Sequence, residues 1–213
     1  VSSGSSLGSN QQIQKMLGEP LPRPVDPDKL PDEVKEYFGR NGILRRLAKK
    51  LKRITGKNIK DIIPSTNIVA SIDEDANLYV GVEFLESFGD NENLIAGIIA
   101  HEWGHLISEL PKGKNYDHLT WDDVFSIRRD EEANADGFAG RALYLLGYKP
   151  DDIVEFLDRS NKKRKLPTHK YHNTATRKEI IIQSFKAMEQ AVESAKNLFY
   201  DSSVKIGRVL GDG

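Results

Sequence analysis

Five consecutive residues, His101-Glu102-Trp103-Gly104-His105, restrict the possible folds and functions of this chain more than any other segment. On an α-helix, residues i and i+4 lie one turn apart on the same face, so both imidazoles can reach one metal ion. Glu102 lies about 100° around the helix from His101, beside the ion, where a carboxylate can accept a proton from metal-bound water. The spacing therefore predicts a helix that carries a zinc site with Glu102 as general base.

The residues before this motif indicate that its helix is buried. Residues 94–100 are all apolar or small, and they lead directly into His101. A buried imidazole needs a polar partner. The alternative interpretation is therefore a core helix whose two histidines are hydrogen-bonded and bind no metal.

A second cluster supplies a candidate for the third zinc ligand. Catalytic zinc sites usually have three protein ligands and one position left for water, and the sequence contains no Cys. Glu132 and Asp136 lie on one face of a predicted helix, so one carboxylate can bind the metal while the other holds a ligand imidazole. The small residues around them would let the two helices pack closely; these are Ala133, Ala135, Gly137, Ala139 and Gly140. The alternative is an acidic, solvated first helical turn.

Together, the two clusters resemble the gluzincin metallopeptidases of the HtpX, BepA and CaaX prenyl protease type. Residues 100–105 match the A-H-E-x-G-H motif of that family, and Glu132 and Asp136 match its E-x-x-x-D motif. The Gly-Tyr pair and Pro that commonly follow are matched by residues 147–150. The resemblance covers about residues 65–180.

This resemblance implies a zincin-like fold and one Zn²⁺ ion per chain. The zinc ligands that it implies are His101, His105 and Glu132. Asp136 would then orient one of the ligand histidines, and the resemblance implies that this histidine is His101. The Thr-His loop of the family is matched by Thr168-His169, although Lys170 replaces its Pro, and Arg177 matches an Arg further on. We therefore expect His169 near the metal, either as an inhibitory ligand or as a group that stabilises the transition state.

Two other alignments stay open. If Asn134 stood at the position of the family's Asp, the ligand would be Asp130, but the Gly147-Tyr148 spacing would no longer fit. Residues 132–134 also resemble the E-x-A-N helix of the ImmA/IrrE-type peptidases, which act on regulatory proteins.

Length and composition indicate one domain with tails. Within the 213 residues, we assign 1–31 to a flexible leader and Pro-rich linker, 32–200 to the metallopeptidase domain and 201–213 to a C-terminal tail. The leader is interpreted either as the remains of an export or lipoprotein signal or as a product of trimming or cloning. The first interpretation predicts an extracytoplasmic location, and a cytoplasmic location is the alternative.

Charge and hydropathy narrow the class of partner. Lys and Arg number 31 against 32 Asp and Glu, so no overall field attracts nucleic acid. The longest apolar run is about seven residues, whereas a membrane helix needs roughly 20. We therefore expect no transmembrane segment, and the soluble BepA-like branch is the better comparison. No feature indicates an oligomeric state.

The predicted architecture is α+β, mostly helical, with a small sheet or hairpin beside the HEWGH helix. Alternating β-formers at 66–72 and 77–84 flank a turn at 73–76. The helices that we predict from periodicity and capping residues cover 43–54, 91–109, 121–147, 150–160 and 173–199.

We therefore expect a zinc-dependent metallo-endopeptidase that hydrolyses peptide bonds in unfolded or flexible protein segments. A zinc-activated water would be the nucleophile, and Glu102 the general base. An edge strand of the small sheet would hold the substrate by backbone pairing. The alternatives are an ImmA/IrrE-like regulatory protease and a non-hydrolytic, zinc-containing chaperone or binding module. A purely structural zinc site would have no use for the base.

Overall fold

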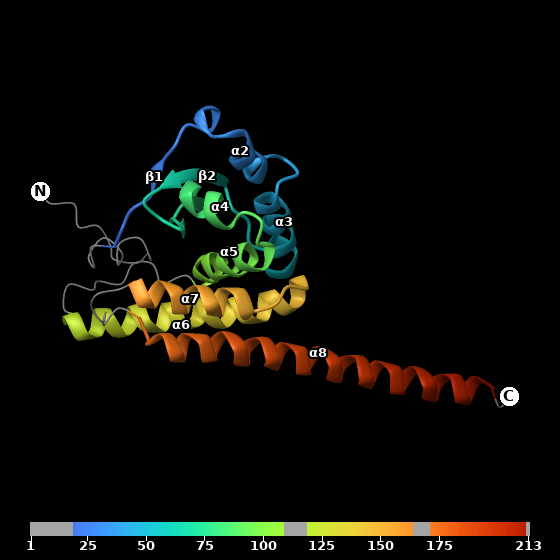
Figure 1. Ribbon diagram of the computed structural model, residues 1–213. Helices are drawn as coiled ribbons and strands as arrows, with labels where there is room; N and C mark the ends of the chain where they lie inside the picture. The colour runs from blue at the N-terminus through green and yellow to red at the C-terminus, as the bar shows by residue number, and fades with distance from the viewer. Residues whose placement is uncertain (1–18, 109–118, 164–170, 212–213) are drawn as a thin grey trace, which may run out of the picture.

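Helix α5 (Glu92–Ile107) runs through the middle of the fold and carries the HEWGH residues (Figure 1). The computed structural model describes residues 19–108, 119–163 and 171–211. Asn91 caps α5, because its side-chain oxygen accepts a hydrogen bond from the Leu94 N–H at 2.9 Å. Of residues 94–100, only Ile98 is not fully buried. Helix α5 is therefore a core element, as expected.

A four-stranded sheet lies on one side of α5. Its strands, in spatial order, are β1 (Arg23–Pro24), β2 (Asp61–Thr66), β4 (Asn77–Gly81) and β3 (Ala70–Ile72). Strands β2 and β4 are parallel, and the two outer pairs are antiparallel. Strand β3 is an edge strand of this sheet and contacts α5. The sheet thus presents a strand edge beside the helix that carries the motif.

The predicted hairpin is confirmed at its centre and wrong at its ends. Strands β3 and β4 pair as antiparallel neighbours, and Asp73 closes their turn by accepting hydrogen bonds from the N–H groups of Asp75 and Asn77. Residues 66–69 do not belong to β3, because Asn67 has a φ of 70° and interrupts the extended chain. Residues 82–84 are helical rather than extended.

Strand β2 and helix α4 (Val82–Phe88) were not predicted. Strand β2 contains Pro64, which lacks an N–H donor and is unusual inside a sheet. The Pro64 carbonyl still accepts a hydrogen bond from the Val25 N–H at 2.9 Å. Helix α4 buries Val82, Phe84 and Leu85. The spacing of two between Val82 and Phe84 suits one face of a strand, whereas the spacing of three between Val82 and Leu85 suits one face of a helix.

Helix α3 (Ile43–Thr55) packs on α5, and the remaining long helices lie on the side of α5 away from the sheet (Figure 1). These are α6 (Trp121–Leu146), α7 (Asp151–Lys163) and α8 (Thr174–Gly211); a 3₁₀ turn (Pro27–Lys29) and α2 (Asp32–Phe38) follow β1. We expected helix α8 to end near residue 199, but it continues to Gly211. Residues 200–210 contain no Pro and one Gly, so no strong helix breaker stops it.

The observed class is α+β, with a small sheet beside a mostly helical body, as expected. Within the described ranges, every helix is either too short or too polar to cross a membrane.

Helices α5 and α6 approach each other closely at Gly104. A Cβ atom on Gly104 would lie only 2.7 Å from the Cα atom of Ala135 on α6. A similar contact joins α6 to α8, because a Cβ atom on Gly140 would overlap the carbonyl oxygen of Ile181. Glycine therefore sets the spacing of these three helices, and with it the position of α6 residues relative to His101 and His105.

Replacing Gly104 by Ala is expected to lower the free energy of unfolding by about 1–3 kcal/mol, because the added methyl group forces α5 and α6 apart. Gly137→Ala is the matched control, since a Cβ atom there would meet only side-chain atoms, at 3.3 Å or more. It should be neutral or slightly stabilising. Urea unfolding of both variants is the measurement, and equal stability would contradict a close contact at Gly104.

Candidate metal centre

The two histidines of α5 project their Nε2 atoms toward one point. The Nε2 atoms of His101 and His105 lie 3.2 Å apart, and their rings stand at 84° to each other. The spacing of four residues brings this about, because it separates the two side chains by about one helical turn. His105 is only 8% exposed. The pair is thus a buried donor set rather than two solvated surface side chains.

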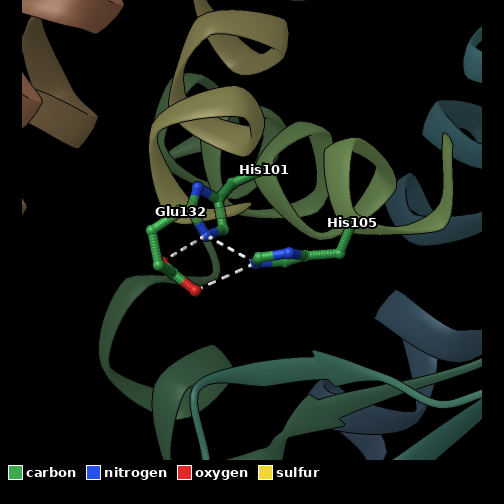
Figure 2. A group of neighbouring side chains, drawn as sticks. All are labelled: His101, His105 and Glu132. Atoms are coloured by element: carbon green, nitrogen blue, oxygen red, sulfur yellow. Dashed lines mark hydrogen bonds and ion pairs between the residues drawn. The ribbon is translucent and has the colours of Figure 1, made fainter. Parts of the chain in front are cut away.

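Glu132 reaches the same point from α6, as Figure 2 shows. Its Oε2 atom lies 3.3 Å from Nε2 of His101, and its Oε1 atom lies 3.2 Å from Nε2 of His105. The ligand atoms of the three residues all lie within 4.8 Å of one another. Two donors on a tetrahedral zinc ion, each at about 2.0–2.1 Å from it, are about 3.3 Å apart. The donor types and their separations therefore fit a zinc ion with three protein ligands.

Asp136, one turn further along α6, holds the other side of His101. Its Oδ1 atom lies 2.9 Å from Nδ1 of His101. Arg177 on α8 in turn donates to both oxygens of Asp136, at 2.7 and 2.9 Å. A proton on Nδ1 leaves the lone pair of His101 on Nε2, directed toward Glu132. Asp136 and Arg177 therefore select the tautomer of His101 that can bind a metal.

Asp136→Asn is expected to weaken zinc binding by about 10–100-fold, because the carboxylate that orients His101 is lost while the shape is kept. Asp130→Asn is the control, since Asp130 lies on the same helix but is exposed. Calorimetric titration of both variants with zinc gives the comparison. Equal affinities would mean that the contact between Asp136 and His101 does not support metal binding.

The charges around the group are strongly coupled. Burial alone would raise the pKa of Glu132, but the neighbouring Arg128 guanidinium, 2.8 Å away, and the two histidines hold it well below its usual range. Burial would lower the pKa of His101, yet its contacts with Asp136 and Glu132 raise that pKa to about 10. Without an ion, a proton on His101 therefore balances the carboxylates. A metal ion would have to displace that proton, so binding is expected to release protons.

The group lies in the wall of a cleft of about 630 Å³. Glu102 lines the same cleft but is not one of the three converging residues. Burial raises the pKa of its carboxyl group, and the nearby histidines counteract part of that rise. Residues 67–71 also line the cleft and bring the start of edge strand β3 to it. The cleft thus combines a possible metal site, a carboxyl group beside it and a strand edge.

The structure brings together the predicted residues of the two motifs, His101, His105, Glu132 and Asp136. Arg177, which was also predicted, contacts Asp136. Asp130, the ligand in the other alignment, is exposed and lies outside the group. His169 falls in 164–170, outside the described residues, so its expected approach to the metal stays a prediction.

Three further residues of the site were not predicted from the sequence. Arg128 stands one turn before Glu132 on α6, and that i, i+4 spacing was the one signal that could have identified it. Glu19 and Tyr171 reach Arg128 from distant parts of the chain. No local pattern indicates either of them.

The chain matches no protein-family model, no curated protein and no solved structure.

Proposed function

We propose that this chain is a zinc-dependent metallo-endopeptidase with a zincin-like fold, related to the gluzincins that its two motifs resemble. The observation that carries the proposal is the convergence of His101, His105 and Glu132, with Glu102 in the wall of the same cleft. Three protein ligands leave one coordination position open, which is typical of catalytic zinc and not of structural zinc.

Each residue has a distinct role in the proposed reaction. A bound zinc ion would supply Lewis acidity, which lowers the pKa of a water molecule and polarises a peptide carbonyl. Glu102 would accept the proton of the attacking water and deliver it to the leaving amine. Its raised pKa suits this exchange, because a carboxylate with a pKa nearer neutrality both takes up and returns a proton readily. Asp136 and Arg177 would keep His101 in its ligand tautomer.

The expected substrate is an extended protein segment. Among the described residues, β3 is an outer strand of the sheet and borders the cleft, and such an edge can pair with a peptide that adds as a further strand. Backbone pairing requires the substrate chain to be unfolded locally. The cleft also has apolar residues of α7 in its wall, namely Ile153, Phe156 and Leu157. These would receive apolar side chains of the bound segment.

The test is metal-dependent cleavage of an unfolded protein. The purified chain is expected to contain one zinc ion and to cut casein at sites that mass spectrometry can map. A chelator should abolish the cleavage, and added zinc should restore it. A chain that carries zinc yet leaves casein intact under all these conditions would favour a non-hydrolytic binding module instead.

A further inference from the structure

Arg128 forms a second binding feature beside the metal group. Its side chain is only 3% exposed, and its guanidinium lies in the wall of the cleft. One nitrogen, NH2, lies 2.8 Å from Oε1 of Glu132 and also 3.1 Å from Oε2 of Glu19. Nε donates to the other oxygen of Glu19 at 3.3 Å. Arg128 therefore grips the carboxylate of Glu19 with two donors, in the forked geometry that suits planar carboxylates.

Tyr171 completes the surroundings of that carboxylate. Its hydroxyl group donates to Oε1 of Glu19 at 3.3 Å. The Arg128 guanidinium lies 5.8 Å from the centre of the Tyr171 ring, a distance at which a cation is attracted to the ring face. The carboxylate thus has three donor contacts from two buried or partly buried side chains. This arrangement recognises a carboxylate by charge and by shape.

Glu19, whose carboxylate Arg128 binds, belongs to a segment with few contacts to the rest of the chain. Glu19 precedes Arg128 by 109 residues. Between Glu19 and residue 25, no residue is fully buried, and β1 pairs over only two residues. The other backbone contacts of this segment are the hydrogen bonds from Asn67 to Leu21 and from Val25 to Pro64. Val25 packs against the cluster of Leu30, Val34 and Val82, but residues 19–24 before it are exposed or half-buried. Few apolar contacts would therefore be lost if residues 19–24 left the cleft.

We propose that Arg128 and Tyr171 form a carboxylate-binding subsite for a peptide, and that Glu19 of the same chain occupies this subsite in the resting protein. The ligand is a carboxylate of the bound peptide, supplied by an acidic side chain or by a free C-terminus. The inference rests on the proposed function, because it takes the cleft to be where a peptide binds. It adds a preference for acidic peptides and a competition between the substrate and Glu19.

Competition follows from the position of Glu19. Glu19 and Pro20 line the same cleft as His101 and Glu102, so a peptide carboxylate that reaches Arg128 in this cleft must displace the carboxylate of Glu19. A peptide carboxylate can replace that of Glu19 with the same donors, and the released Glu19 regains its hydration. A neutral peptide offers no such exchange, so it is expected to bind with Glu19 still held by Arg128.

The test measures peptide binding without turnover. Calorimetry uses the full chain with Glu102→Gln, loaded with zinc, and three acetylated heptapeptides of one neutral sequence. The first has a single internal Glu and an amidated C-terminus, the second has Gln and a free C-terminal carboxylate, and the third has Gln and an amidated end. Each is measured with and without the added substitution Glu19→Gln, which removes the charge and keeps the size. Glu33→Gln, an exposed position on α2, is the matched control.

Glu19→Gln is expected to tighten binding of at least one carboxylate peptide by about tenfold, while the neutral peptide changes little. Whichever peptide gains identifies the source of the carboxylate. Adding Arg128→Lys should abolish the gain, because lysine keeps the charge but loses the fork. Should that variant fail to fold in urea unfolding, Tyr171→Phe supplies the same test with a smaller, few-fold loss. If neither carboxylate peptide gains from Glu19→Gln, the pair of Glu19 and Arg128 is a structural tether and the proposal is wrong.

The two proposals fail separately. Cleavage of casein by the native chain with no preference for carboxylate peptides would overturn the subsite and leave the peptidase intact. Carboxylate binding that depends on Glu19 and Arg128, in a chain that cuts nothing, would overturn the peptidase and leave the subsite.

Discussion

Replacing Glu102 by Gln is expected to lower the rate of peptide cleavage by about 10²–10⁴-fold, the usual contribution of a general base. The amide has the size of the carboxyl group but cannot accept the proton of the attacking water. Zinc content should stay at the native value, because Glu102 is not among the converging ligand atoms. Cleavage of casein under conditions of excess substrate, with metal analysis of the same sample, gives both quantities.

Glu86→Gln is the matched control for this experiment, since Glu86 is an exposed residue on α4 and lies outside the cleft. It should cleave at the native rate. A Glu102→Gln chain that cleaved as fast as this control would exclude Glu102 as the base. The proposed mechanism would then lack its base, because Glu132, the carboxyl group that lies beside both histidines, is assigned as a zinc ligand.

Glu132→Ala is expected to abolish stoichiometric zinc binding, because it removes one of three ligands. It also leaves Arg128 buried without the carboxylate at 2.8 Å, and removing one partner of a buried pair costs about 3–5 kcal/mol in the free energy of unfolding. Glu132→Gln keeps the side-chain volume and a hydrogen-bonding oxygen. It should therefore retain more stability while still binding zinc poorly. Metal analysis after dialysis, together with urea unfolding, separates the two effects.

Asp130→Ala decides between the two alignments of the second motif. Asp130 is exposed, so its substitution should leave zinc content and stability close to native values. Loss of zinc from the Asp130 variant, with Glu132→Ala unaffected, would transfer the ligand role to Asp130.

The members of the candidate metal group could be predicted because their spacing is a local property. His101 and His105, like Glu132 and Asp136, are four residues apart, and on a helix this separation puts each pair on one face whatever surrounds it. Both helices form where the apolar run before His101 and the helical periodicity from residue 121 onward predict them, and in the structure a capping box of Thr120 and Asp123 begins the second helix. The coarse α+β class follows from the same local patterns.

The ends of the strands and of α8 were not predictable in the same way. A residue such as Val82 suits a strand or a helix equally well, and contacts with the rest of the fold decide between them. Pro64 is unusual inside a sheet, yet it lies in β2 opposite Val80, and its carbonyl accepts a hydrogen bond from Val25. Local propensity is too weak a term to determine these boundaries alone.

The sequence by itself determined which side chains could bind a metal and which carboxyl group stands beside them, because helical periodicity requires only neighbouring residues. The tertiary structure alone decided how those pairs meet. Gly104 brings α6 close enough for Glu132 to reach both histidines, and Arg177 on α8 fixes Asp136. The tertiary structure also places Glu19 beside Arg128, although the two residues are 109 positions apart in the sequence. Contacts of this kind depend on chain packing over long separations, and no local pattern encodes them.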